Sequence, residues 1–302
     1  MPDGPEPRLA VNKTYKLYLG GAFPRSESGR SYVVSSHEGR SLANAALASR
    51  KDLRDAVVAA RKAVPGWSGA TAYLRGQILY RAAEMLEGRQ AQFVEDLVLG
   101  EGLTRHAASA TVGLTVDRLV WYAGWSDKLA QVAGSANPVA GPYFDFSIPE
   151  PTGVVGVLAP QASSLLGLVS VVAPVITTGN TAVVVASEDR PLPAVDFAEV
   201  LATSDLPGGV VNILTGRAAE LSPVLAAHRD VDALDLAGAP PELAIQLEEA
   251  AADNVKRVLR RRQPEPDWPE PDWPEPDWTV EPTPARMLSF VEIKTVWHPV
   301  GV

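Results

Sequence analysis

The sequence contains no cysteine among its 302 residues. That absence excludes disulfides, thiolate metal sites and any mechanism that uses a cysteine nucleophile. Histidine is scarce as well, and the four histidines lack the spacing of metal ligands: His37, His106, His228 and His298. The sequence therefore predicts no metal site.

An excess of positive charge is also missing. Lys and Arg number 27 against 36 Asp and Glu, which gives a net charge of −9, and nothing favours nucleic-acid binding. The longest apolar run, 165–176, is too short to span a bilayer, and the first thirteen residues lack the apolar core of a signal peptide. With 46% hydrophobic residues the chain can still form a substantial core. We expect a cytoplasmic protein without nucleic-acid or membrane partners.

The first half of the chain shows a hairpin pattern followed by helical periodicity. Residues 14–35 alternate around two glycine turns and predict a short hairpin. Ser49 is a suitable N-cap for a helix that we expect to stop at Pro65-Gly66, and helical spacing continues to about Leu129. Residues 134–153 contain two runs separated by prolines and predict a strand pair.

The second half alternates between short apolar runs and helical stretches. The runs expected to form strands are 154–159, 181–187, 210–214 and 231–237. Strands that are apolar throughout need helices on both faces, so the pattern predicts an α/β fold with a Rossmann-type, doubly wound parallel sheet. The last helix is expected to start at Pro241 and to end at the arginines up to Arg262, and 288–297 reads as one strand. The G-x-G-x-x-G fingerprint is absent, so the sheet alone does not indicate a dinucleotide site.

Three copies of the pentapeptide PEPDW occupy residues 264–278. Proline at this density favours polyproline II, in which fifteen residues would span roughly 45 Å. The repeated tryptophans are costly if exposed: Trp268, Trp273 and Trp278. They fold back onto the chain, bind a partner, or result from a neutral expansion of the repeat.

Three segments resemble the aldehyde dehydrogenase superfamily: PTGVVGVLAP, TTGNTAVVVASE and LPGGVVNILTG. The resemblance covers nearly all of 14–260, and VEIKTVW resembles the family's C-terminal oligomerisation strand. It implies a disordered N-terminus at 1–13 and a cofactor-binding-type domain at 14–262. A repeat linker at 263–285 would stand where the family has a catalytic domain, before an oligomerisation-type strand at 286–302.

The resemblance implies chemistry that this sequence lacks. The family uses a cysteine nucleophile, an asparagine that holds the oxyanion, and a glutamate base. No cysteine is present, Gln161 and Ala162 stand where the family has Trp and Asn, and Arg261 is nearest to the position of the glutamate. A guanidinium cannot act as a base at neutral pH. We therefore expect no catalytic residues.

The cofactor-binding positions of the family are only partly kept. The family contacts the adenosine ribose with a lysine and a glutamate, of which only Glu188 remains here. The family's Phe-Thr-Gly-Ser motif, whose serine helps to hold the pyrophosphate, is replaced at 236–239, and only its glycine, Gly238, remains. Gly216 also matches the family, although glycines in such turns can serve backbone geometry alone. The vestigial cofactor-binding set is therefore Glu188, Gly238 and Gly216. We expect no bound cofactor, with NAD or NADP binding weakened at best.

These features together predict a non-catalytic member of the family, in which the segments for oligomerisation are kept and the chemical groups are lost. Its expected partner is a full-length aldehyde dehydrogenase homologue or a second copy of itself. Three alternatives remain open: an NAD(P)-binding module, an oxidoreductase acting on aldehydes with NAD(P), and the product of a decaying gene.

Overall fold

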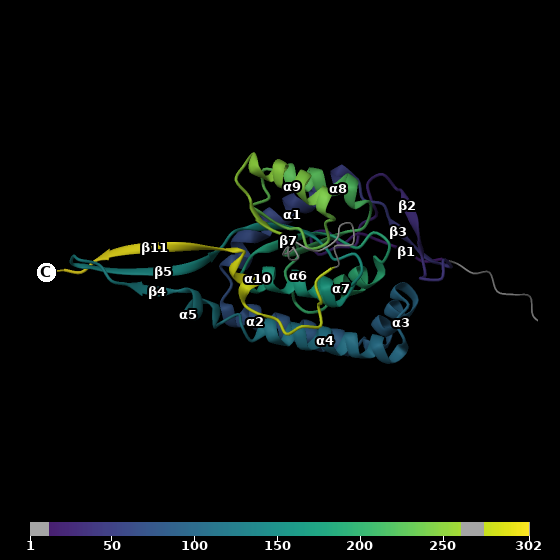
Figure 1. Cartoon of the computed structure of the whole chain (residues 1–302), viewed down its shortest axis with the longest axis horizontal. Coiled ribbons are helices and arrows are strands. Elements are labelled where there is room, and N and C mark those ends of the chain that lie inside the picture. Colours follow the sequence, from purple (N-terminus) through teal and green to yellow (C-terminus); the bar gives the residue numbers. More distant parts are fainter. Residues whose placement is uncertain (1–11, 261–274, 302) are drawn as a thin grey trace, which may run out of the picture.

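The computed structural model describes residues 12–260 and 275–301. Most of the predicted disordered N-terminus and most of the repeat linker lie outside these ranges. A parallel sheet with helices on both faces forms the body of the described chain, and a narrow antiparallel sheet projects from it (Figure 1). The predicted α/β class is confirmed.

The central sheet has five parallel strands in the order β10-β9-β6-β7-β8. In chain order they are β6 (Val154–Leu158), β7 (Thr181–Val185), β8 (Val211–Leu214), β9 (Ala233–Asp235) and β10 (Arg257–Leu259). The first four lie within the predicted apolar runs. They are buried along their whole length, which is why they lack the alternation of a half-exposed strand.

The fifth strand corrects the predicted end of the last helix. Helix α9 (Pro241–Ala252) stops ten residues before Arg262, and 257–259 pair with β9 instead. Val255 adopts a left-handed conformation with φ of 56°, which a continuing helix does not allow. The arginines therefore do not lie at a helix C-terminus.

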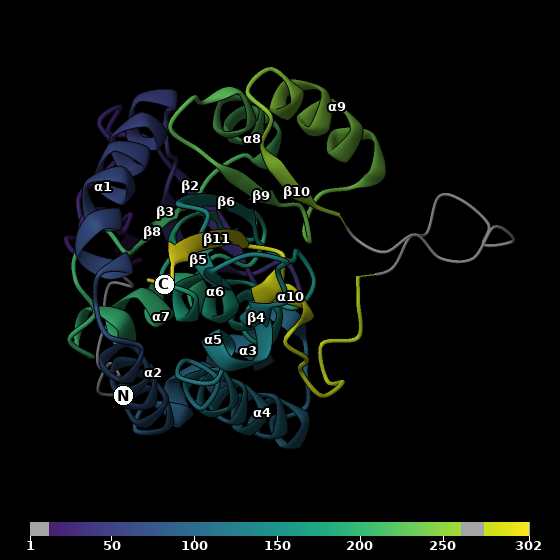
Figure 2. The same cartoon turned by 90° about the vertical axis from the view of Figure 1, so that its left-hand side faces the viewer.

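Helices cover both faces of the sheet (Figure 2). One face carries α1 (Arg50–Ser68), α8 (Ala218–Ala227) and α9, and the other carries α6 (Leu166–Thr177) and α7 (Leu192–Ala202). The longest apolar run of the sequence forms α6, and all of its residues are buried, because α2 (Ala72–Glu87) and α4 (Arg105–Ala123) pack on its outer side. In the described ranges no helix combines the length and apolarity needed to cross a bilayer.

Helix α1 begins as predicted but ends later. Pro65 lies inside the helix, which continues to Ser68, so the predicted stop at Pro65-Gly66 is wrong. The last turn is held by Trp67, which is buried and donates from Nε1 to the carbonyl of Ile176 at 2.9 Å. This tertiary contact outweighs the loss of one helical N–H. Two shorter helices flank α4 in the chain: α3 (Gln90–Glu101) and α5 (Leu129–Ala133).

Ser49 forms a capping box with Asp52, and its loss should weaken α1. The Ser49 hydroxyl accepts from the Asp52 amide at 3.2 Å, and the Asp52 carboxylate accepts from the Ser49 amide at 2.8 Å. We expect Ser49→Ala to lower the free energy of unfolding by about 1 kcal/mol in urea denaturation. Ser49→Thr keeps the hydroxyl and should lose much less; equal losses in both variants would show that the cap contributes nothing.

The predicted hairpin over 14–35 is wrong. The strands there are β1 (Thr14–Tyr15) and β2 (Ser31–Ser35), and they do not pair with each other. Strand β3 (Ser41–Ala46) lies between them, parallel to β1 and antiparallel to β2. Across the Gly20-Gly21 turn, Leu19 and Ala22 form an isolated bridge and the Leu17 amide donates to the Pro24 carbonyl at 3.1 Å, but these contacts do not extend into β1 and β2. The local sequence does not reveal that a third segment inserts.

The projecting sheet has the order β11-β5-β4 and confirms two sequence predictions. Strands β4 (Ser135–Asn137) and β5 (Tyr143–Pro151) form the predicted strand pair, and β11 (Val291–Pro299) pairs with β5 along its whole length. A polar ladder crosses the three strands: the Asn137 amide donates to Asp145 at 2.8 Å and to Ser147 at 2.9 Å, and Ser147 lies 2.9 Å from the Thr295 hydroxyl. The ladder sets the register of β4 and β11 against β5.

Residues 275–290, here called the strap, connect the repeats to β11. The strap contains α10 (Ala285–Leu288), which packs on α6. Trp278 of the third repeat is buried, and Arg118 of α4 donates to its carbonyl at 2.7 Å and to that of Val280 at 2.9 Å. Trp278 thus folds back onto its own chain, whereas the other two repeat tryptophans lie outside the described residues.

Candidate functional site

The order of the parallel strands places the candidate site at the carboxyl ends of β6 and β9. From β6 the chain adds β7 and β8 on one side and then returns to add β9 and β10 on the other. The connections that follow β6 and β9 therefore diverge to opposite sides of the sheet. Ligands of open α/β sheets bind in the crevice at such a switch point.

The loop after β6 presents a row of four main-chain amides at this edge. The amides of Gln161, Ala162 and Ser163 donate to the Glu275 carboxylate, the second at 2.8 Å and the third at 3.2 Å. The next amide, of Ser164, donates to Glu101 at 2.7 Å. Rows of amides of this kind bind anions, and here two carboxylates of the same chain occupy the row.

Glu101 is the last residue of α3 and is half-buried. Besides the Ser164 amide it accepts from the Ser164 hydroxyl at 2.6 Å. Burial raises the pKa of Glu101, and the nearby Glu275 adds to this rise, whereas the bonds from Ser164 and the charge of Arg190 oppose it. Nothing local in the sequence marks Glu101, because its partner lies 63 residues away.

Gln161 and Ala162, at the positions where the family was expected to have Trp and Asn, serve the loop itself. The Gln161 side chain donates to the Ala159 carbonyl at 2.7 Å and accepts from the Glu188 amide at 3.0 Å, so it joins the loops after β6 and β7. Ala162 is exposed, and its methyl group cannot donate a hydrogen bond. Its carbonyl accepts from Arg190 at 2.8 Å. The side chain of residue 162 therefore cannot hold an oxyanion.

Glu188, the predicted ribose contact, has partners on its own chain. Its carboxylate forms an ion pair with Arg217 and accepts from the amide of Ala218 at 3.1 Å, at the start of α8. A carboxylate at this position is stabilised by the helix dipole. Its main-chain carbonyl accepts from the Tyr32 hydroxyl at 3.0 Å. In this arrangement Glu188 caps α8.

The other two predicted cofactor residues occupy positions where backbone geometry requires glycine. Gly216 has a φ of +146°, a conformation that residues with a side chain rarely adopt. Gly238 lies against the carbonyl of Ala159, and its amide donates to the Leu158 carbonyl at 2.9 Å. Both positions are explained by the fold without a ligand.

Asp235, the last residue of β9, forms the other side of the switch point. It is fully buried and pairs with Arg286 of the strap, whose guanidinium stacks 5.4 Å from the centre of the Trp278 ring. Its other oxygen accepts from the amide of Ala237 at 3.1 Å. The strap therefore contacts both sides of the switch point, the loop after β6 through Glu275 and the end of β9 through Arg286.

The groups at this edge do not fit a dinucleotide as they are arranged. The amide row that could bind a phosphate group already binds Glu275 and Glu101, and Glu188, the expected ribose contact, already binds Arg217. Among the described residues there is also no cluster of His, Asp and Glu that could hold a metal ion. Arg261, expected nearest to the position of the family's glutamate base, lies outside the described ranges.

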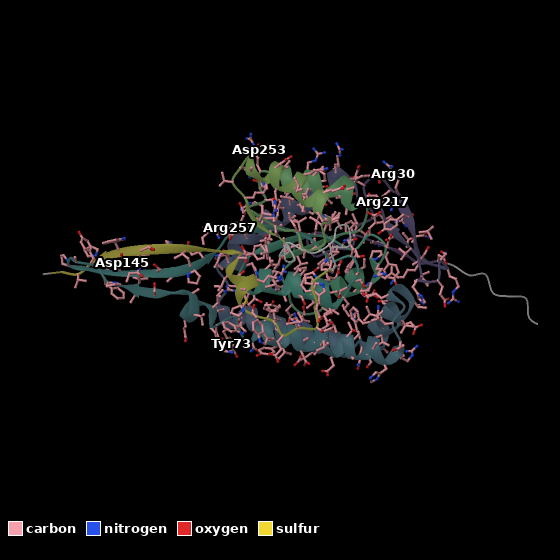
Figure 3. The ribbon with its side chains drawn as sticks, viewed as in Figure 1. Arg30, Tyr73, Asp145, Arg217, Asp253 and Arg257 are labelled. Carbon is pink, nitrogen blue, oxygen red and sulfur yellow. The ribbon has the colours of Figure 1, made fainter. Side chains whose placement is uncertain are left out.

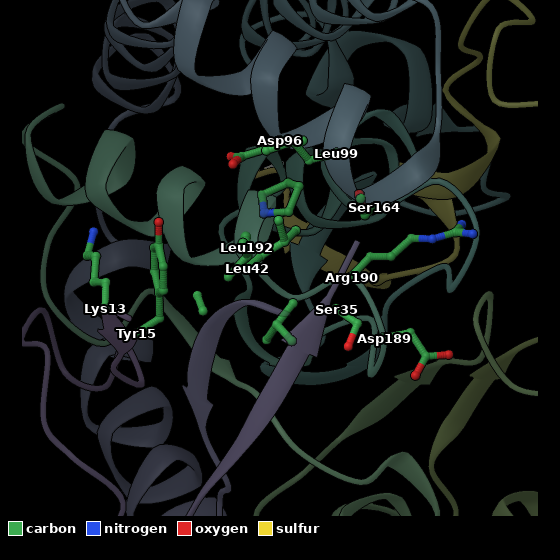
Figure 4. Close-up of a pocket in the computed structure, with 14 residues that line it drawn as sticks. Lys13, Tyr15, Ser35, Leu42, Asp96, Leu99, Ser164, Asp189, Arg190 and Leu192 are labelled. Atoms are coloured by element: carbon green, nitrogen blue, oxygen red, sulfur yellow. The ribbon is translucent and has the colours of Figure 1, made fainter. Parts of the chain in front are cut away.

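A separate cavity of about 180 Å³ lies between the N-terminal sheet and α3 (Figure 4). Lys13 and Tyr15 lie at one end of it and Asp189 and Arg190 at the other, with Asp96 projecting from α3. Burial raises the pKa of Tyr15 to about 12, with help from nearby carboxylates. The sequence did not predict this cavity, because its walls come from segments far apart in the chain.

Asp96 of this cavity forms a buried pair with Asp196 of α7. Asp196 is fully buried, and both of its oxygens lack a hydrogen-bond donor among the described residues. Two carboxylates can bond only by sharing a proton. Burial, followed by the hydrogen bond and the charge of Asp196, raises the pKa of Asp96 to about 9, while Lys13 opposes the rise. At neutral pH Asp96 therefore keeps its proton.

Comparison with known proteins gives one consistent result. The model of the aldehyde dehydrogenase family matches residues 23–260. Cytosolic 10-formyltetrahydrofolate dehydrogenase of Xenopus laevis is 31% identical over 258 residues, which are 83% of this chain and 28% of that protein. Aldehyde dehydrogenase, cytosolic 1 of Elephantulus edwardii is 30% identical over 266 residues, 85% of this chain and 52% of that protein.

Solved structures agree with the sequence relatives. An aldehyde dehydrogenase from Bacillus cereus, solved as an NAD+ complex, superposes with a TM-score of 0.77 at 25% identity and covers 82% of this chain and 50% of that one. HpcC from Thermus thermophilus gives the same TM-score at 27% identity, over 82% and 47%. The chain thus spans about half the length of these two proteins and a smaller share of the formyltetrahydrofolate enzyme.

Proposed function

The chain belongs to the aldehyde dehydrogenase family, and from that premise we propose that it is a non-catalytic subunit. Its partner would be a full-length family member or a second copy of itself. The observation that carries the proposal is the projecting sheet on a chain without any cysteine. In the arrangement described, this subunit would bind no NAD or NADP.

The projecting sheet has the properties of an association surface. Its large apolar side chains are exposed over 37% to 58% of their area: Tyr143, Phe144, Ile148, Ile293 and Trp297. Tyr143 and Trp297 stack edge to face with ring centres 5.7 Å apart. Exposed aromatic side chains gathered on one element are typical of sites where proteins bind each other.

The outer edge of this sheet supports the same proposal. Strand β11 pairs with β5 on one side, and in the described ranges no strand pairs with its other side. A nine-residue edge strand leaves main-chain donors and acceptors open to another chain. Natural proteins usually shorten or cover such an edge, so one of this length suggests a partner.

Association should depend on the aromatic residues of the sheet. We expect a double variant, Phe144→Ser with Trp297→Ser, to weaken assembly by about tenfold or more, since buried aromatic anchors contribute about 1 to 3 kcal/mol each. The measurement is size-exclusion chromatography with light scattering, on the chain alone and mixed with a full-length aldehyde dehydrogenase of the same source.

Tyr73→Ser provides the control for this experiment. Tyr73 is 70% exposed on α2, away from the sheet that carries Asp145 (Figure 3). Its loss should leave the elution profile unchanged. A wild-type chain that stays monomeric at tens of micromolar, both alone and with the full-length protein, would contradict the proposed function.

A further inference from the structure

We propose that the strap is an autoinhibitory cover, and that Glu275 keeps anionic ligands out of the amide row at the switch point. The inference extends the proposed function, because it names what closes the cofactor-type edge of this subunit. It concerns phosphate-bearing ligands, since their oxygens make the same hydrogen bonds with main-chain amides as a carboxylate does.

The first support is the stereochemistry of the Glu275 contact. One carboxylate accepts from three consecutive amides, of which two donate to the same oxygen. This is how an amide row binds one oxyanion group of a ligand. The Glu275 carboxylate therefore takes the place of such a group, and the two cannot bind at once.

The second support is the position of the contact in the fold. The row follows β6, one of the two strands at the switch point, where ligands of such sheets bind. The strap also holds the other strand, through Arg286 and the buried Asp235 of β9. One segment thus contacts the loop after β6 and the end of β9, at the edge where a ligand would enter.

The third support is the unequal anchoring of the strap. Its C-terminal part is buried through Met287 and Phe290, and the Phe290 carbonyl accepts from the buried Asn180 at 2.7 Å. Glu275 lies on the N-terminal side of the buried Trp278, the two residues between them are exposed, and the Glu275 side chain is held by polar contacts with the amide row. Glu275 can therefore leave the amides while the rest of the strap stays in place.

The test compares ligand binding by the wild-type chain and by Glu275→Ala, using isothermal titration calorimetry. Inorganic pyrophosphate probes the amide row alone, and NAD probes whether the opened edge accepts a dinucleotide. We expect Glu275→Ala to bind pyrophosphate about tenfold more tightly than wild type or better, because an internal competitor lowers the apparent affinity by the fraction of chains in which it is bound. Glu275→Gln, which keeps a polar but uncharged side chain, should lie between the two.

Glu281→Ala is the matched control. Glu281 is an exposed carboxylate of the same strap, so its loss changes the net charge equally without opening the amide row. Glu281→Ala should bind pyrophosphate as wild type does. If both alanine variants gain affinity equally, the effect is general electrostatics and the inference is wrong.

Hydrogen exchange gives a readout that needs no ligand. In Glu275→Ala the amides of 161–163 should exchange faster, while those of α6 stay protected as in wild type. Equal, weak pyrophosphate binding by wild type and Glu275→Ala would overturn the strap inference and leave the proposed assembly intact. Tight NAD binding by the wild-type chain would instead overturn both the inference and the proposed absence of a cofactor.

Discussion

Replacing Gly238 by alanine is expected to destabilise the fold by about 3 kcal/mol or more, the range of backbone clashes that cannot relax. A Cβ at this position would lie on the Ala159 carbonyl group, 2.5 Å from its carbon and 3.0 Å from the Leu158 oxygen. Leu158 is the last residue of β6, Ala159 follows it, and Gly238 follows the neighbouring buried strand β9, so neither main chain can move aside cheaply. Chemical denaturation monitored by circular dichroism measures the loss directly.

A second glycine provides the control for that prediction. Gly113 lies in α4 with no atom within 4 Å of a Cβ built on it. Gly113→Ala should be neutral or stabilise the chain by up to about 1 kcal/mol, because alanine favours helix. A Gly238→Ala chain as stable as wild type would show that this glycine is not needed for packing, and the cofactor interpretation of Gly238 would become the stronger one.

The sequence predicted the central sheet well because burial leaves a local signature. Uninterrupted apolar runs such as 181–187 identify strands covered on both faces, and the strands found there begin and end within two residues of the runs. Helix ends were predicted less well, since Pro65 is overruled by the tertiary contact of Trp67 and the left-handed Val255 has no sequence signal. The hairpin failed for a related reason, because β3 supplies the pairing.

The candidate site was harder to predict than the fold. The family resemblance indicated which chemical groups are absent, but it could not indicate what replaces them. Glu275 reaches amides more than a hundred residues away, and Glu101 reaches the adjoining one from α3. Contacts at such separation depend on the assembled fold. The same holds for Asp96 and Asp196, which lie on separate helices and meet only when α3 packs on α7.

Asp96→Asn is expected to make the chain more stable than wild type at pH 8, by up to about 4 kcal/mol. In the native chain burial and the neighbouring Asp196 raise the pKa of Asp96 to about 9, whereas an unfolded aspartate titrates near 3.9. Asparagine carries no charge and can still donate a hydrogen bond to Asp196, so it keeps the contact without requiring a proton. Lys13 and Glu95, the other charged groups acting on Asp96, remain unchanged.

The difference between variant and wild type should grow with pH. Between about pH 4 and pH 9 native Asp96 keeps a proton that the unfolded chain has lost, so this group makes the free energy of unfolding fall as pH rises, by up to about 1.4 kcal/mol per unit. The contribution is complete below the unfolded pKa and is gone above about pH 9. Urea denaturation should therefore show nearly equal stability of Asp96→Asn and wild type at pH 5, and a clear gain for Asp96→Asn at pH 8.

Asp55→Asn is the control, because it removes an exposed carboxylate paired with Lys51; it should change stability by less than about 1 kcal/mol at both pH values. A gap between Asp96→Asn and wild type that stays constant or narrows towards pH 8 would mean that Asp96 is ionised in the native chain, and the shared proton would have to be abandoned.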